Sequence, residues 1–234
     1  MRGANWKRDK YTRRRKSGGR RSPVTPKLST TSVGVRHAGF LPPVTEITLE
    51  RLRKGFSGHT PVRMDDPAAA QAAVALVVVA EAGDLDVLFI RRAEMPGDPW
   101  SGHIALPGGR RHSPFEDLRQ TATREAWEEV GITLSQDDFL AELDEVTPRT
   151  RTLRPIVVRP HVFGLAQRPE LSLSSEVADS LWIPLSTLCR SRGETLVDVH
   201  GTSLRVPAFI IGTTVVWGLT ERIVNHFINL LDTI

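Results

Sequence analysis

One predicted helix limits what this chain can fold into, because three glutamates share one side of it. The segment 117–130 is typical of a helix, and Gly131 suits the position just after its last turn. At 100° per residue, Glu125, Glu128 and Glu129 fall within an arc of about 100°. Like charges at these spacings repel by about 0.2–0.5 kcal/mol per pair, so the arrangement brings no structural gain. It becomes favourable when a divalent cation lies over the arc, and carboxylate oxygens suit Mg²⁺ or Mn²⁺.

Residues next to the glutamates predict how this helix is held. Arg124 lies at the edge of the arc, where its forked guanidinium can fix a carboxylate in place. Ala122, Ala126 and Val130 form a ridge of small residues that allows close packing on a sheet. A solvated, glutamate-rich helix is the alternative. The apolar side chains of Trp127, Val130 and Ile132 favour the packed helix.

A glycine pair precedes the helix and suits the same chemistry. Gly108 and Gly109 follow Pro107. Two consecutive residues without a Cβ let the backbone approach a ligand closely and direct a carbonyl oxygen at a metal ion.

The whole segment resembles the Nudix box, G-x5-E-x7-R-E-U-x-E-E-x-G-U, where U is a bulky apolar residue. Seven fixed positions match: Glu116, Arg124, Glu125, Glu128, Glu129, Gly131 and Ile132. Two positions depart from the pattern. Six residues rather than five separate Gly109 from Glu116, and Ala126 replaces a bulkier residue. The insertion leaves Asp117 as an alternative to Glu116.

The resemblance implies an α/β fold (α+β) of the Nudix type, an α/β/α sandwich with a mixed sheet. It implies a pyrophosphohydrolase that acts on phosphorus-containing anhydrides, with Mg²⁺ or Mn²⁺ as cofactor. The ligands it implies for the cation are Glu125, Glu128, Glu129, Glu116 and a backbone carbonyl at Gly109.

The same resemblance implies the catalytic groups. Arg124 orients the glutamates, and Glu128 acts through the metal. The carboxylate that accepts the proton stays open between Glu125 and Glu176, which lies outside the helix. For Glu176 a surface turn residue is the alternative.

Two further stretches resemble the coenzyme A pyrophosphatase-like branch of the family. They are residues 90–109 and 217–220. That branch has an Arg and a His where this chain has Asp98 and Trp100. We therefore expect hydrolysis of a nucleoside diphosphate linked to another moiety. A coenzyme A pyrophosphatase is the first alternative, and a non-catalytic module that senses nucleotides is the second.

Four residues before the box are candidates for substrate binding. Arg91 and Arg92 are possible phosphate contacts, or else charges that keep an edge strand soluble. Trp100 suits stacking on a base, or filling the core under its loop. His103 is a possible substrate contact, or a solvent-facing histidine.

Charge separates the first residues from the rest. Residues 1–21 hold ten Lys and Arg against one acid, so the remaining 21 basic and 26 acidic residues leave a mildly acidic body. The sequence pI near 9.7 therefore describes a tail. Residues 1–44 are predicted to be a disordered basic extension, favoured as solvated. A weak, non-specific nucleic-acid contact and an organelle transit peptide are the alternatives.

Residues 45–234 are predicted to form one Nudix hydrolase domain. A helix over 45–54, capped by Thr45, precedes a hairpin of strands at 73–80 and 85–91, and an apolar stripe predicts a last helix at 219–231.

Cysteine content and hydropathy bear on where the chain works. The single cysteine, Cys189, excludes an internal disulfide and favours a reducing compartment, so we expect a cytoplasmic protein. The longest apolar run, 72–80, is too short to span a bilayer, and no secretory signal is expected. We expect a small nucleotide-diphosphate substrate and no membrane partner, and leave a homodimer open.

Overall fold

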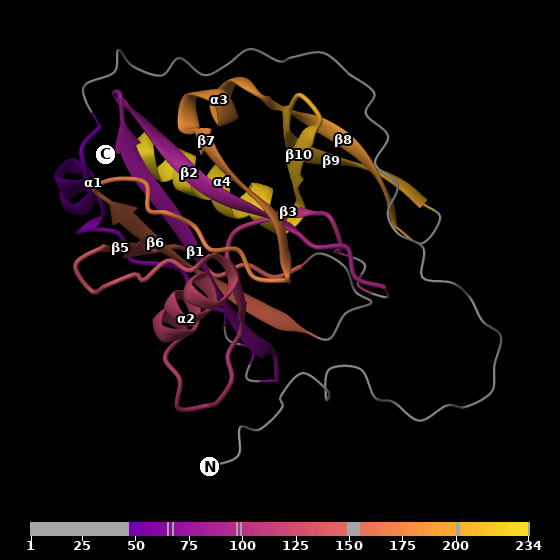
Figure 1. Cartoon of the computed structure of the whole chain (residues 1–234), viewed down its shortest axis with the longest axis horizontal. Coiled ribbons are helices and arrows are strands. Elements are labelled where there is room, and N and C mark those ends of the chain that lie inside the picture. The colour runs from indigo at the N-terminus through magenta and orange to yellow at the C-terminus, as the bar shows by residue number, and fades with distance from the viewer. Residues whose placement is uncertain are drawn as a thin grey trace.

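The computed structural model describes residues 47–233 except 65, 67, 97, 99, 149–154 and 200–201. The predicted extension 1–44 and the predicted cap Thr45 lie outside the described residues. Within the described part, a mixed sheet lies between helices (Figure 1). No helix there has the length and apolar character needed to cross a membrane.

The main sheet has seven strands, and a smaller antiparallel sheet has three. The strands of the main sheet are β1 (Ala70–Glu81), β2 (Asp84–Arg92), β3 (Ile104–Ala105), β4 (Gly108–Arg110), β5 (Phe139–Glu142), β6 (Ile156–Leu165) and β7 (Val177–Pro184). The smaller sheet contains β8 (Arg192–Val199), β9 (Thr202–Ile211) and β10 (Thr214–Trp217). The helices are α1 (Leu49–Phe56), α2 (Leu118–Val130), α3 (Leu185–Arg190) and α4 (Gly218–Leu231).

The predicted hairpin between β1 and β2 is confirmed. Glu81 pairs with Asp84, which leaves a two-residue turn at Ala82 and Gly83. Both turn residues have positive φ, 50° and 82°, the backbone of a type I′ turn that matches the twist of the strands. On its other side β1 runs parallel to β6. This parallel pair makes the sheet mixed.

β1 changes partner along its length, and this creates space in the sheet. Its residues 78–81 pair with β2, whereas its residues 72–74 pair with β4. β2 pairs with β3 at Ile90 and Arg91 instead. β1 and β2 therefore separate toward the start of β1, and the glycine pair of β4 fills part of the gap.

Helices cover both faces of the sheet, as Figure 1 shows for α2 and α4. The side chains of a strand alternate between faces. Ala73, Ala75 and Val77 pack with α2, whereas Leu76 and Val78 pack with the cluster that contains α1, α3 and α4. The predicted α/β/α sandwich with a mixed sheet is confirmed.

The first helix begins later than predicted. α1 covers Leu49–Phe56 rather than 45–54, because the Thr48 hydroxyl accepts a hydrogen bond from the Arg51 N–H at 3.2 Å. A side-chain acceptor at this position ends the extended segment and starts the helix.

Several shorter elements were not expected from the sequence. α3, β3, β4 and β10 were not predicted. Strand β5 ends at Glu142, and Val146 further along makes only an isolated bridge to Val158.

Candidate active site

Helix α2 begins with a reciprocal pair of hydrogen bonds. The Asp117 carboxylate accepts the Arg119 N–H at 2.7 Å, and the Gln120 side chain accepts the Asp117 N–H at 3.0 Å. This capping box fixes the first turn. Gly131 ends the helix with φ of 75°, a left-handed conformation that glycine adopts without strain. Asp117 is thus used as the helix cap, so it is not a substitute for Glu116.

The small-residue ridge of α2 packs as predicted, but its tryptophan does not. Ala122, Ala126 and Val130 are fully buried against the sheet. Trp127 is 62% exposed, so the expectation that it packs is wrong. It follows Ala126 by one residue, which turns it about 100° away from the buried ridge.

Arg124 joins three carboxylates and a backbone carbonyl. Its Nε donates to Glu116 Oε1 at 2.8 Å. Its Nη1 donates to Glu125 Oε1 at 3.0 Å and to Glu128 Oε2 at 3.2 Å. Its Nη2 donates to the Arg110 carbonyl at 3.2 Å. The guanidinium therefore orients three acidic side chains relative to strand β4.

Glu116 faces this cluster despite the inserted residue. Its second carboxylate oxygen accepts the His112 N–H at 2.7 Å. Burial works against its charged form, but the hydrogen bonds from Arg124 and His112 outweigh it and hold the pKa of Glu116 below its ordinary value. Glu116 is therefore a fixed, ionised carboxylate.

The three helix glutamates lie at different depths. Glu129 is buried, and its Oε2 accepts the Gly108 N–H at 2.9 Å. Burial, opposed by that hydrogen bond and reinforced by the charge of Glu125, raises the pKa of Glu129 to about 8. Burial also raises the pKa of Glu125, against the effect of Arg124. The Glu128 side chain is 45% exposed.

The site residues fit a divalent cation. Glu129 is buried and Glu125 is half-buried, and burial raises the pKa of both, so a cation between them would stabilise their charged forms. A Cβ added at Gly109 would overlap the Glu125 carboxylate, so glycine leaves room for this side chain against β4. Hard oxygen donors from Glu125, Glu129 and this backbone match the preferences of Mg²⁺ and Mn²⁺.

A cavity of about 160 Å³ opens beside Glu129. It lies where β1 and β2 separate. Its polar lining comes from Arg92, Gly108, Glu129 and Thr220, and its apolar lining includes Val74, Ile90, Ala105, Leu106, Val158, Leu219 and Ile223. A basic residue, Arg92, and an acidic residue, Glu129, therefore line the same cavity.

The structure separates the two predicted arginines. Arg92 lines the cavity, and its Nη2 pairs with Asp98 Oδ2 at 2.7 Å. Its Nε is buried and has no hydrogen-bond partner among the described residues. Arg91 is not in the lining of this cavity; it pairs in the sheet with Asp179 and Ile104.

Trp100 and His103 pack into an aromatic cluster with Trp217, which comes just before α4. The centroid of the His103 ring lies 5.7 Å from that of Trp100 and 5.1 Å from that of Trp217. Burial lowers the pKa of His103. His103 is thus half-buried rather than solvent-facing, and neither residue lines the cavity itself.

Glu176 lies near the end of α2 and is exposed. Its backbone carbonyl accepts the Ala93 N–H at 2.9 Å, and the Ser174 N–H donates to the Glu129 carbonyl at 2.9 Å. The charge of Glu176 adds slightly to the raised pKa of Glu129, after burial and the charge of Glu125.

Two contacts of the site were not predicted from the sequence. The Arg110 carbonyl holds Arg124, and the His112 N–H holds Glu116. Both are backbone groups, which every residue carries, so side-chain identity gives no signal for them.

The fold and this site define an α/β/α sandwich protein with an acidic centre of the kind that holds divalent cations. Residues 69–199 match the NUDIX domain. The chain belongs to the Nudix family, and its resemblance to the coenzyme A pyrophosphatase-like branch is confirmed by relatives with that name.

Three similar proteins illustrate the relationship. The chain is 38% identical over 121 residues to uncharacterized protein C14C4.10c of Schizosaccharomyces pombe, covering 50% of this chain and 37% of that protein. It is 30% identical to the mitochondrial coenzyme A diphosphatase NUDT8 of Mus musculus, covering 78% of this chain and 87% of that protein. A MutT/nudix family protein from Enterococcus faecalis shares the fold, with a TM-score of 0.51 and 15% identity over 80% of this chain and 71% of that chain.

Proposed function

We propose that this protein is a metal-dependent hydrolase that cleaves the diphosphate bond of a nucleoside diphosphate linked to another moiety. One observation supports this most. The buried Glu129 lines a cavity that Arg92 also lines, and the half-buried Glu125 lies against Gly109; burial raises the pKa of both carboxylates.

The proposed metal ligands are Glu125, Glu128, Glu129, Glu116 and the Gly109 carbonyl, with Mg²⁺ or Mn²⁺ as the ion. When bound, the cation supplies charge neutralisation for the diphosphate and lowers the pKa of a water molecule. Arg124 keeps Glu116, Glu125 and Glu128 in fixed positions.

For proton removal we propose Glu125, with Glu176 as the alternative. Burial raises the pKa of Glu125, and a carboxylate with a raised pKa is a better base near neutral pH. Glu176 is exposed and comes from another segment of the chain.

Arg92 is the proposed phosphate contact among the four predicted substrate-binding residues. Its cavity position and its unpartnered Nε leave a hydrogen-bond donor for an anionic oxygen. Asp98 neutralises part of its charge. Arg91, Trp100 and His103 remain candidates for contacts outside the cavity, where the aromatic cluster offers a surface for a base.

A coenzyme A pyrophosphatase is the second candidate. The supporting observation is the alignment to the mouse coenzyme A diphosphatase, which covers 87% of that protein. The chain spans only 37% of the fission-yeast relative. The substrate of this chain is therefore a proposal and is not taken over from its relatives.

One panel of substrates tests the proposal. Purified full-length protein is incubated with nucleotide sugars, dinucleoside polyphosphates, nucleoside triphosphates, NADH, ADP-ribose and coenzyme A, with and without Mg²⁺ or Mn²⁺. We expect metal-dependent product release from at least one diphosphate. Binding without turnover across the panel would instead support the nucleotide-sensing alternative. Coenzyme A as the best substrate would decide between the two enzymatic candidates.

The domain organisation, cellular location and partners of the protein are also proposals. We propose that residues 45–234 form one domain, because α1 and α4 share a core cluster with the sheet. Deletion of residues 1–44 tests whether the basic extension binds RNA, and should leave hydrolysis intact.

Oligomeric state and location need separate measurements. Light scattering tests for a homodimer. Cell fractionation tests the cytoplasmic location, since the mouse relative is named as mitochondrial.

A further inference from the structure

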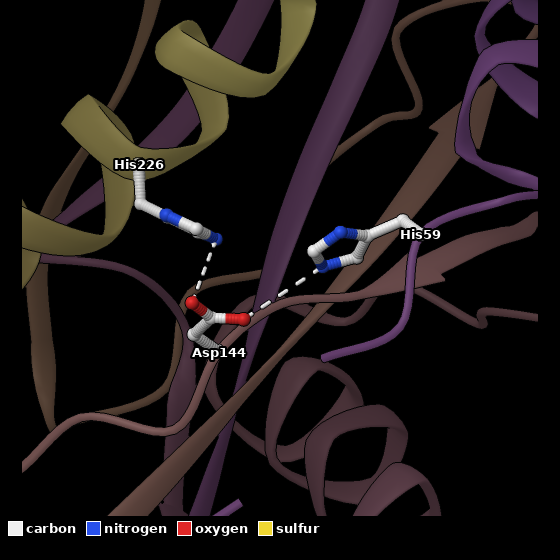
Figure 2. A group of neighbouring side chains, drawn as sticks. All are labelled: His59, Asp144 and His226. Atoms are coloured by element: carbon white, nitrogen blue, oxygen red, sulfur yellow. Dashed lines mark ion pairs between the residues drawn. The ribbon is translucent and has the colours of Figure 1, made fainter. Parts of the chain in front are cut away.

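Three side chains far apart in the sequence meet on the α4 side of the sheet. His59 follows α1, Asp144 follows β5, and His226 lies within α4. Figure 2 shows both imidazole rings directed at the one carboxylate. None of the three belongs to the glutamate site on α2.

The geometry of this cluster is unusual for a set of ordinary ion pairs. His59 Nε2 lies 3.8 Å from Asp144 Oδ1, and His226 Nε2 lies 3.7 Å from Asp144 Oδ2. These separations are too long for hydrogen bonds. Yet both Nε2 atoms are buried and lack a hydrogen-bond partner within the described part of the chain. Burying two polar nitrogens without partners is costly, so the cluster needs something between its members.

A metal ion of tetrahedral preference fits the space. The three ligand atoms lie within 4.8 Å of one another. With bonds of about 2.0–2.1 Å, a tetrahedral Zn²⁺ holds neighbouring ligand atoms about 3.3 Å apart. The distances of 3.8 and 3.7 Å run to different oxygens of Asp144. With one ligand atom from each residue, separations within 4.8 Å have to close by up to about 1.5 Å, by rotation of the side chains.

We propose that His59, Asp144 and His226 form a second metal site, which takes Zn²⁺ with a water molecule as fourth ligand. Two imidazoles and one carboxylate favour Zn²⁺ over Mg²⁺, because Mg²⁺ prefers oxygen ligands alone. The side chains are 16%, 31% and 29% exposed respectively, which gives an ion and a water access from solvent.

Neighbouring contacts already hold the ligands in place. Asp144 Oδ1 accepts the Val62 N–H at 2.9 Å, a contact of the kind that orients metal ligands. The His59 N–H donates to the Phe56 carbonyl at 3.0 Å. Phe56 also packs on Phe227, with ring centroids 6.0 Å apart, so α1 and α4 are held together next to the cluster.

The ion would cross-link three segments of the fold. It would tie α4 to the segment after α1 and to the segment after β5. The first residues of α4 line the cavity beside Glu129, so the cross-link would also hold one wall of that cavity in place.

The test measures Zn²⁺ binding to the full chain in the presence of excess Mg²⁺, which occupies the carboxylate site on α2. After chelator treatment and dialysis, calorimetry should give one tightly bound Zn²⁺ per chain. Asp144→Asn, His59→Gln and His226→Gln should each weaken binding by at least about 100-fold, more than loss of an outer-shell contact costs. Asp137→Asn, an exposed acid, is the matched control and should bind as wild type does.

A second measurement covers variants that fold poorly. Co²⁺ added to the wild-type protein should give the intense visible absorption of a four-coordinate site, and Zn²⁺ should displace it. Zn²⁺ should also raise the melting temperature of the wild type but not that of Asp144→Asn. Absence of tight Zn²⁺ binding in excess Mg²⁺ would overturn the proposal. So would unchanged Zn²⁺ binding in all three variants. Neither result depends on whether the protein hydrolyses a diphosphate.

Discussion

The Arg124 guanidinium donates to Glu116, and this bond places the residue before the α2 cap at the acidic centre. The Nε to Oε1 distance is 2.8 Å, and the neighbouring Asp117 points its carboxylate at the helix start instead. The inserted residue after the glycine pair therefore extends the loop without moving Glu116 out of the site.

Two single substitutions should separate these neighbours. Glu116→Gln removes the charge that pairs with Arg124 and would bind the proposed metal, so we expect the proposed hydrolysis to fall by roughly 10–100-fold. Asp117→Asn should leave the rate within about twofold, because Asn caps helices as well as Asp does. Steady-state kinetics at several Mg²⁺ concentrations measure both. Equal losses in the two variants would contradict the assignment.

Gly109→Ala should damage the site without unfolding the protein. The new methyl group would overlap the Glu125 carboxylate and push it from its position. We expect the rate of hydrolysis to fall by at least about tenfold. Displacing a metal ligand should lower activity as much as removing a hydrogen bond that orients the ligand. Gly58→Ala is the control, because a Cβ there meets nothing within 4 Å. A wild-type rate for Gly109→Ala, with unchanged circular dichroism, would disprove the close approach.

Adjacent residues of α2 should differ sharply in their effect on stability. Ala126 is fully buried against the sheet, so Ala126→Leu should lower the free energy of unfolding by about 1–3 kcal/mol. Trp127 is 62% exposed, so Trp127→Ala should change the same quantity by less than about 0.5 kcal/mol. Urea denaturation measures both. A larger loss for Trp127→Ala would mean that the helix faces the sheet differently.

His103 should make stability depend on pH. Burial lowers its pKa below the ordinary 6.5. The unfolded chain then binds a proton that the folded chain does not, so stability falls as the pH drops through about 6.5 toward the lowered value. His103→Gln should flatten the difference in unfolding free energy between about pH 5.5 and 7.5. An identical pH dependence in wild type and variant would show that His103 is not the cause.

The sequence alone was sufficient to predict the acidic helix and the central hairpin. Both depend on local patterns: a helical period with a closing glycine for 117–130, and β-branched runs around a short turn for β1 and β2. The exposure of Trp127 was not predicted, because residue type alone does not tell whether a large apolar residue lies on the buried ridge of a helix or one position beyond it.

The rest depends on contacts between distant segments. β4 is a strand only because it pairs with residues 72–74 of β1, and its Gly-Gly-Arg sequence has no strand pattern of its own. The cluster of His59, Asp144 and His226 likewise has no spacing that a motif would reveal, because the fold alone brings those positions together. Such features can be recognised only once the positions of distant segments in the fold are known.

The most direct test of the central claim compares the wild type with Glu129→Gln. The amide oxygen of the introduced glutamine can still accept the Gly108 N–H, so the variant keeps the contact and loses the carboxylate that would ionise to hold the proposed cation. Phosphorus NMR follows cleavage of ADP-ribose and of coenzyme A with and without Mg²⁺. We predict Mg²⁺-dependent diphosphate cleavage by the wild type and a rate at least about 100-fold lower for the variant. Equal rates in the two proteins, or cleavage that needs no divalent cation, would contradict this prediction.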